Sequence, residues 1–122
     1  MRKAKIVPEE VILESRRYRQ LQDLFFDELG FIEYLMSFKD GDIIGHGRNS
    51  YDNPIANYIV KQLGWTPHEV LSWMVYTREV NLDMGKEHFM LPEWAAKVML
   101  FSDSKVFDTI VTAREIKSDF LG

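Results

Sequence analysis

The sequence of 122 residues contains no cysteine. This absence excludes disulfide scaffolds, thiolate nucleophiles, cysteine-bound zinc and iron–sulfur clusters, and it makes the cytoplasm the expected location. Long apolar runs are missing as well, since none approaches the roughly 18 residues that a membrane-spanning helix needs. The N-terminal stretch also lacks the apolar core and the cleavage site of a signal peptide. We therefore expect a cytoplasmic protein that does not enter a membrane.

Patterns typical of catalytic and metal-binding sites are also missing. None of the three histidines, His46, His68 and His88, has a second histidine four residues away, the spacing that places two zinc ligands on one helical face. The glycine-rich segment 41–53 lacks the Lys-Ser/Thr pair of a phosphate-binding loop, and the chain contains no Gly-x-Ser-x-Gly sequence. The sequence predicts no catalytic residue, no metal ion and no cofactor, and an enzyme of an unrecognised type is the third interpretation.

What the sequence does contain is apolar material for one core. Hydrophobic residues make up 46% of the chain, and they include eight Phe, five Tyr and three Trp. A chain of this length supports one domain. We therefore expect residues 1–122 to form a single globular domain with an aromatic-rich core.

Charge is unevenly distributed along the chain. Residues 1–20 hold six basic and three acidic side chains, a net +3, which leaves −7 for the remainder of a chain whose net charge is −4. An acidic body repels the phosphate backbone of nucleic acids. The charge distribution therefore argues against nucleic acid as the partner.

The N-terminal third is predicted to be helical. Pro8 suits the first position of a helix, and apolar residues at three- and four-residue spacing continue along one buried stripe to Leu29. Gly30 then permits a left-handed cap or a kink. The apolar segment 31–38 predicts a second short helix, and the segment 41–53, rich in glycine, asparagine and aspartate, predicts a loop.

Capping residues mark three further helices. Asn53 and Pro54 have the N-cap and first-turn chemistry of a helix that continues to Gly64. The apolar spacing over 91–103 predicts another helix. Thr112 caps the last one, and a glutamate three residues later completes a capping box.

The segment between these helices supports two interpretations. Thr66 and Glu69 have the spacing of a capping box, which favours a helix from Pro67. Residues 70–80 are rich in Val, Trp, Tyr and Thr, and the β-favouring piece 87–91 follows a turn-like stretch, which favours a two-stranded hairpin. These residues alone leave the choice between helix and hairpin open.

Three stretches resemble a family of small bacterial proteins for which no activity is assigned. They are NPIANYI at 53–59, LPEWAAKVMLFSD at 91–103 and VTAREI at 111–116, and they span roughly the C-terminal 70 residues. Asn53 and Arg114 depart from the family pattern, which has Cys and often an acidic residue at these positions. The resemblance implies a shared fold unit with a β-hairpin in its middle, and it transfers no catalytic residue.

Taken together, the patterns predict a mostly helical α+β domain. Four to five helices are expected, with a small β-hairpin at about 70–90.

A helix-turn-helix is the alternative interpretation of residues 55–74. It implies a DNA-binding transcriptional regulator, and a strand over 66–80 would remove it. The predicted second helix offers no Arg or Lys for phosphate or guanine contacts. The residues that would contact DNA are Lys61, Thr66, His68 and Ser72.

Contact with a protein partner, or with a second copy of the chain, is the function that the sequence favours. Loops on a rigid scaffold often carry recognition, and exposed aromatic residues often anchor interfaces. Aromatic residues that lie in or beside predicted turns, where we expect some to remain exposed, are Tyr51, Trp65, Trp73, Tyr76 and Phe89. The predicted contact residues are His46, Arg48, Tyr51, Asp52 and Trp65.

Overall fold

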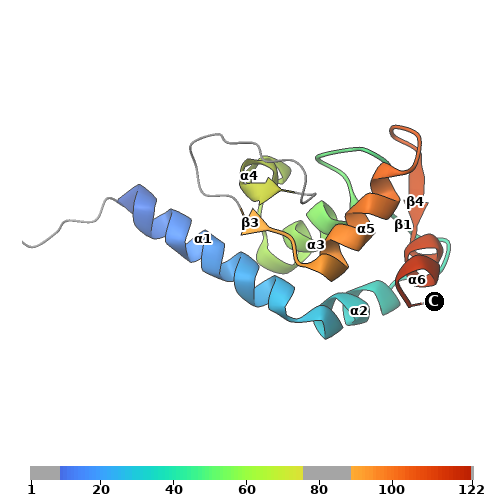
Figure 1. Ribbon diagram of the computed structural model, residues 1–122, viewed down its shortest axis with the longest axis horizontal. Coiled ribbons are helices and arrows are strands. Elements are labelled where there is room, and N and C mark those ends of the chain that lie inside the picture. The colour runs from blue at the N-terminus through green and yellow to red at the C-terminus, as the bar shows by residue number, and fades with distance from the viewer. Residues whose placement is uncertain (1–8, 76–88, 122) are drawn as a thin grey trace, which may run out of the picture.

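The computed structural model describes residues 9–75 and 89–121, and in these ranges the chain is mostly helical (Figure 1). The helices are α1 (Glu9–Phe26), α2 (Glu28–Met36), α3 (Pro54–Leu63), α4 (Pro67–Trp73), α5 (Glu93–Asp103) and α6 (Ala113–Leu121). The strands are β1 (Ile43–His46), β2 (Met74–Val75), β3 (Phe89–Met90) and β4 (Ile110–Thr112). The predicted mostly helical α+β class is confirmed. Among these helices, none has the length and apolar character that crossing a membrane requires.

The boundary between the first two helices lies earlier than predicted. Helix α1 ends at Phe26, and Asp27 caps α2 by accepting a hydrogen bond from the Gly30 amide to its side chain at 3.0 Å. An aspartate at the N-cap competes with continued helix, because its carboxylate satisfies an amide that otherwise lacks a partner. The expectation of a cap or kink at Gly30 is wrong, since Gly30 lies inside α2. The break also leaves Leu29 exposed rather than on the buried stripe.

Helix α3 begins and ends as its sequence predicts. Asn53 accepts a hydrogen bond from the Ala56 amide at 2.8 Å, and Pro54 occupies the first turn. At the other end, Gly64 adopts a left-handed conformation with φ of 71°, which glycine reaches without steric cost. Asn53 is fully buried, so this cap is part of the core.

Both predicted capping boxes are present. The Thr66 amide donates to Glu69 at 3.2 Å while the Glu69 amide donates to the Thr66 hydroxyl at 3.2 Å, and α4 follows. Thr112 and Glu115 repeat this reciprocal pair at the start of α6. Of the two interpretations left open for this segment, the helix from Pro67 is the one that forms over Pro67–Trp73.

The segment predicted as a loop over 41–53 contains strand β1. This strand pairs antiparallel with β4, with His46 opposite Ile110 and an irregularity between Ile43 and Gly45. Glycine at 45 lets the strand pass directly against the start of α3, because a Cβ there would lie 2.7 Å from the Pro54 ring. The pairing joins parts of the chain more than sixty residues apart, which a local pattern of turn residues does not reveal.

The hairpin predicted at about 70–90 is also corrected. Strands β2 and β3 pair in parallel, with Met74 opposite Phe89, whereas the strands of a hairpin are antiparallel. The chain between them, 76–88, lies outside the described residues. Because α4 forms where the first strand of a hairpin was weighed, six helices are described in place of four or five.

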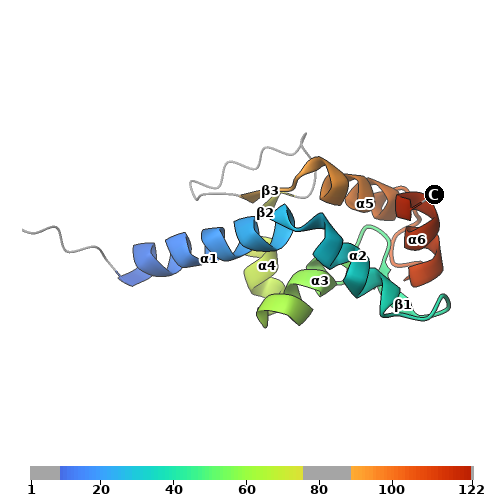
Figure 2. The ribbon, with the colours of Figure 1, turned by 90° about the horizontal axis from the view of Figure 1, so that it is seen from below.

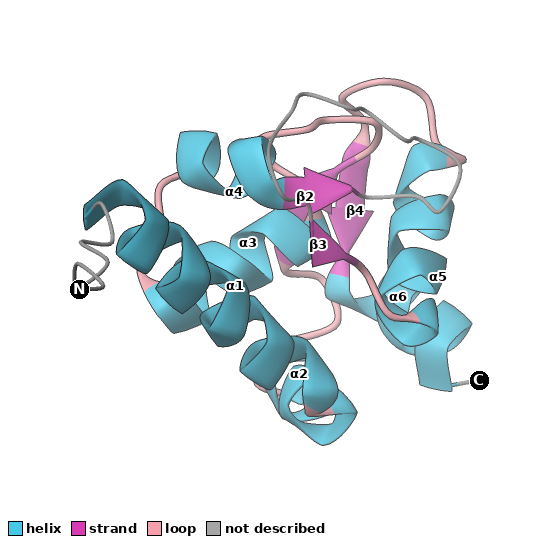
Figure 3. Ribbon diagram, turned by 60° about the vertical axis from the view of Figure 1, so that its left-hand side comes forward, coloured by secondary structure: helices cyan, strands magenta, loops and turns pink. Residues whose placement is uncertain are grey.

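The core is an aromatic cluster gathered around α3. Figures 1 and 2 show α1 and α2 following one another along one side, with α5 and α6 across the molecule and α3 among them. Phe31 meets Tyr58 edge-on at 5.0 Å between ring centroids, and Phe25 stacks on Phe89 at 5.6 Å. The Trp94 indole donates to the Phe25 carbonyl at 3.2 Å, which ties α5 to α1. Figure 3 shows how small the strands are beside the helices. The predicted aromatic-rich core is confirmed.

Candidate functional site: a groove between α2 and α3

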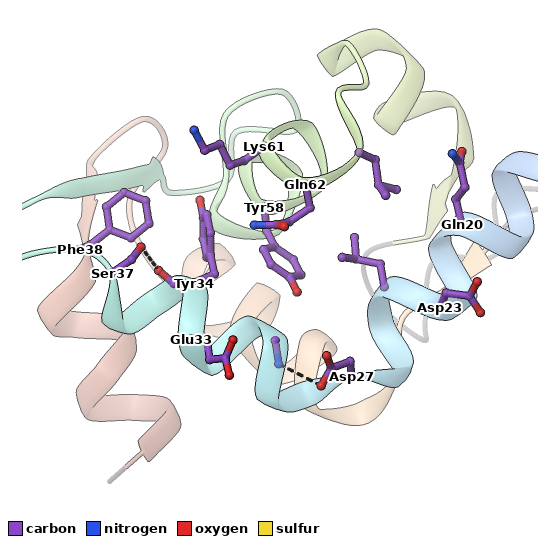
Figure 4. Close-up of a pocket in the computed structure, with 13 residues that line it drawn as sticks. Gln20, Asp23, Asp27, Glu33, Tyr34, Ser37, Phe38, Tyr58, Lys61 and Gln62 are labelled. Carbon is purple, nitrogen blue, oxygen red and sulfur yellow. Dashed lines mark hydrogen bonds between the residues drawn. The ribbon is translucent and has the colours of Figure 1, made fainter.

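A groove of about 740 Å³ runs between α3 and the wall formed by α1 and α2 (Figure 4). Its size falls in the range of sites that bind small ligands or a few side chains. Apolar and aromatic groups line much of it, among them Leu24, Leu63 and Phe38. We define these walls, together with the polar residues described next, as the α2–α3 groove.

Carboxylates outnumber cations in the α2–α3 groove. Asp23 at the end of α1, Asp27 at the break and Glu33 on α2 face a single basic residue, Lys61 on α3. Within 9–75 and 89–121, no basic side chain forms a salt bridge with any of these three carboxylates. The groove therefore presents a negative field that the described part of the fold leaves uncompensated.

Two tyrosines contribute hydroxyl groups to the groove. Tyr58 is 2% exposed and its ring is packed by Phe25, Phe31 and Tyr34, yet its hydroxyl has no hydrogen-bond partner among the described residues. The Tyr34 hydroxyl likewise has no partner in the described ranges. No side-chain oxygen in the described chain is both buried and unpartnered, so the two hydroxyls are open to solvent at the groove. They are thus available to a ligand.

Both hydroxyls stay protonated over the physiological range. Burial raises the pKa of Tyr34 to about 12. Burial also raises the pKa of Tyr58 to about 12, and the charges of Asp27 and Glu33 and the neighbouring Tyr34 add to the effect. Each phenol therefore keeps an O–H donor and an acceptor oxygen at neutral pH.

Two polar groups of the groove lie close to the bare Cα of Gly30. A Cβ at Gly30 would lie 2.9 Å from the Asp27 Oδ2 atom and 3.3 Å from the Tyr58 hydroxyl, so a side chain at position 30 would crowd both. In Figure 4 the Tyr58 hydroxyl points toward Asp27. The glycine thus lets one carboxylate and one phenol lie near each other at the edge of the groove.

The loop predicted to make partner contacts uses its polar groups inside the fold. His46 Nδ1 lies 2.8 Å from one carboxylate oxygen of Asp52. The other carboxylate oxygen accepts a hydrogen bond from the side-chain amide of Asn57 at 2.7 Å. Arg48 donates to the Asp103 carbonyl at 2.8 Å. The structure thus brings His46 and Asp52 together as a pair that shapes this loop.

The predicted aromatic anchors fall into different environments. Trp65 is 7% exposed and lies beneath Arg17, whose guanidinium carbon is 5.7 Å from the ring centroid, so it is not among those that remain exposed. Phe89 is buried as well. Tyr51 is exposed and contacts His68 edge-on at 5.3 Å. The side chain of Trp73, and Tyr76, lie outside the described part of the chain.

The four residues predicted to contact DNA in the helix-turn-helix alternative lie in different environments. Helices α3 and α4 do follow one another through Gly64, but the Thr66 hydroxyl is engaged by Glu69. Lys61 lines the α2–α3 groove, His68 contacts Tyr51, and only the backbone of Ser72 is described. That alternative keeps its helical geometry and stays a prediction.

Sequence reasoning missed the groove. Asp23 and Asp27 fall off the apolar stripe of the first predicted helix, and Tyr58 falls beside the apolar face of the helix after Pro54, as solvated and core residues ordinarily do. The one local signal was Asp27 followed by Gly30, a capping pair that marks the break. Nothing local indicates that this break meets α3.

Comparison of the chain with protein-family models, with curated proteins and with solved structures finds no match. The function must therefore be argued from the geometry of the α2–α3 groove.

Proposed function

We propose that this chain is a non-catalytic cytoplasmic binding protein that accepts a segment of a protein partner in the α2–α3 groove. One observation carries the proposal: the hydroxyl of Tyr58, a residue that is 2% exposed, faces the groove without a hydrogen-bond partner among the described residues. No side-chain oxygen in the described chain is both buried and unpartnered, so this hydroxyl is open to solvent although its ring is buried. A ligand in the groove can therefore bond to it directly.

The chemistry of the walls supports a peptide-like ligand. Binding sites combine apolar and aromatic walls with a few convergent polar groups, and tyrosine is enriched at the core of protein interfaces. Here Leu24, Phe38 and Leu63 form the apolar walls, and Tyr34 and Tyr58 supply the convergent polar groups. The loop residues predicted from sequence remain a second predicted contact area.

Selection and mapping test the proposal. A phage-displayed peptide library is selected on the whole chain, and a selected peptide is titrated into the ¹⁵N-labelled protein. We expect saturable amide shifts in α2 and α3, and weaker binding to Tyr58→Phe than to Tyr51→Phe, a matched control on the exposed loop. Shifts confined to residues 46–53, or equal binding by both variants, would contradict the groove as the site.

Self-association is the version of this proposal in which the partner is a second copy. Static light scattering over a range of concentrations measures it directly. A mass that rises with concentration in the native chain and not in Tyr58→Phe would identify the second copy as the ligand. A monomer mass throughout would assign the groove to a different protein.

The observation that favours the DNA-binding alternative is the helical form of α4 after the left-handed turn at Gly64. Lys61→Ala separates the two functions, because Lys61 would contact phosphate in one and lines an acidic groove in the other. Loss of salt-sensitive binding to genomic DNA fragments in this variant would support DNA binding. No retardation of DNA at low salt would remove it.

A further inference from the structure

We infer that the α2–α3 groove binds a cationic group on an aliphatic stem, a guanidinium or an ammonium, through the Asp27 carboxylate and the Tyr58 hydroxyl beside Gly30. The inference rests on the proposed function, because it names the ligand chemistry of the same groove. A basic side chain of a partner protein and a free organic amine are the two sources of this chemistry.

Charge in the groove favours a cation. Among the described residues that line the groove, Asp23, Asp27 and Glu33 are opposed by Lys61 alone, and none of these four forms a salt bridge within the described chain. The three carboxylates are exposed, so a cation that enters gains attraction from several of them at once, and added salt weakens that attraction. An anionic ligand would meet the opposite field.

The hydrogen-bond geometry beside Gly30 leaves two oxygens for a ligand. The Asp27 Oδ1 atom already accepts the Gly30 amide, whereas Oδ2 has no bond in the described ranges. Oδ2 lies 2.9 Å and the Tyr58 oxygen 3.3 Å from the position that a Cβ on Gly30 would take, so the two oxygens lie close together beside this glycine. A group with several N–H donors can reach both oxygens from the groove, and bonds from a cation to a carboxylate are the strong kind.

The apolar lining of the groove suits the stem of such a ligand. Leu24, Leu63 and the rings of Tyr34 and Phe38 all line it. Lysine and arginine bury their methylene stems on apolar surface, and cations are attracted to aromatic faces. A planar guanidinium matches two convergent acceptors better than an ammonium does.

A metal ion fits this site poorly. In the described part of the chain, no group of three or more His, Asp or Glu side chains gathers closely enough to hold one. Mg²⁺ and Ca²⁺ need several oxygen ligands around one point. The spread of the carboxylates along the groove suits a ligand with an extended stem.

Titrations of the whole labelled chain test the inference. The probes are the peptide Gly-Arg-Gly-Arg-Gly, the same peptide with citrulline for arginine, and spermidine. Citrulline keeps the shape of arginine and removes the charge. We expect the arginine peptide to shift the amides of residues 27–34 and 58–62 and to bind about tenfold more tightly than the citrulline peptide, which loses a charge-assisted bond.

Three variants locate the site. Asp27→Asn keeps the helix cap but removes the charge, and we expect it to weaken the arginine peptide about tenfold. Gly30→Ala places a Cβ against Asp27 Oδ2 and the Tyr58 hydroxyl, which must shift, and it should weaken binding of the arginine peptide roughly fivefold. Lys61→Ala removes the opposing charge and should tighten it about threefold. A citrulline peptide that binds equally well, or an Asp27→Asn variant that is unchanged, would overturn the inference.

The outcomes also separate the inference from the proposed function. If the library peptides that bind in the groove contain no basic residues, the proposed function would be supported and the inference of a cationic ligand would be contradicted. Spermidine that binds as tightly as the arginine peptide would support the cation and contradict a protein partner. Absence of groove shifts with every probe and every library peptide would contradict both.

Discussion

The α2–α3 groove and the loop from His46 to Asn53 both adjoin α3 and carry similar side chains, yet they differ in where their polar groups find partners. In the loop, Asp52 binds His46 with one oxygen and Asn57 with the other. In the groove, Asp27 uses one oxygen for the Gly30 amide, and the Tyr58 hydroxyl has no partner among the described residues. The polar groups of the loop therefore hold the loop in shape, whereas some polar groups of the groove are left for a ligand.

In this fold, a polar cluster that supports structure differs from one that can bind a ligand in whether its polar atoms are already hydrogen-bonded within the protein. Residue type and position on a loop favoured the first region, because loops often carry recognition. The hydrogen bonds favour the second region, because Asp27 Oδ2 and the Tyr58 hydroxyl bond to no described residue, whereas both oxygens of Asp52 do.

The largest effect is expected on the loop side, from Asn53→Ala. Asn53 is fully buried, caps α3 through the Ala56 amide and donates to the Asn49 carbonyl at 2.9 Å. Loss of the cap together with a buried partner left unpaired should lower the free energy of unfolding by about 3 kcal/mol. Urea denaturation measures it. A loss under about 1 kcal/mol would show that the hydrogen bonds of Asn53 contribute little to the stability of the fold.

A smaller loss of stability is expected at alkaline pH, where the two tyrosines of the groove ionise. The pKa values of Tyr34 and Tyr58 are raised from 10.0 to about 12, so the unfolded chain releases these protons first. Their contribution to stability is complete below pH 10 and is lost as the pH rises toward 12.

Denaturation midpoints at pH 9, 10 and 11, compared between the native chain and Tyr34→Phe/Tyr58→Phe, measure this loss. We expect the native midpoint to fall more steeply than that of the double variant. Equal slopes would show that the two phenols are not shielded from solvent.

Next in size is Glu115→Gln, which alters a carboxylate that the fold already uses. Burial tends to raise the pKa of Glu115, but hydrogen bonds from Lys105 and from the Thr112 amide outweigh it, and the pKa is lowered. The stabilisation is present above the pKa of the unfolded chain and is lost as the pH falls through the lowered value. We expect the variant to lose about 1 kcal/mol at pH 7.

The native chain should approach this variant's stability in acid. Thermal unfolding at pH 7 and at pH 3 checks both statements, and Glu33→Gln in the groove is the matched control with no expected loss. An equal loss from both substitutions would erase the distinction between used and available carboxylates.

The smallest effect is expected from Tyr58→Phe. Its hydroxyl makes no bond within the described chain, so its removal should change the free energy of unfolding by less than about 0.5 kcal/mol, in contrast to most buried polar deletions. The same urea titrations provide the value. A loss above about 1.5 kcal/mol would mean that the hydroxyl is already satisfied, and the groove would lose its main distinguishing feature.

Local chemistry accounts for what could be predicted from the sequence. Asn53 before Pro54, and threonines followed three residues later by glutamate, mark helix starts because the side chain and the amide that it binds are only three residues apart. The mostly helical class followed from such signals and from apolar spacing.

Long-range contacts account for what could not be predicted. Strand β1 exists because it meets β4, and the groove exists because the break at Asp27 faces Tyr58 on α3. Trp65 lies beside a turn but is covered by Arg17, which is nearly fifty residues away in sequence. Each of these features is decided by two distant segments, and no single window of sequence contains both.

The glutamates of the two capping boxes each divide their oxygens between a near and a far partner. Glu69 binds Thr66 with Oε1 and Arg17 with Oε2, and Glu115 divides itself in the same way between Thr112 and Lys105. The first turn of α4 is therefore complete only when α1 has docked beside it. Each of these carboxylates joins a helix cap to a distant part of the chain. These helices are therefore expected to form and unfold together with their neighbours rather than one at a time.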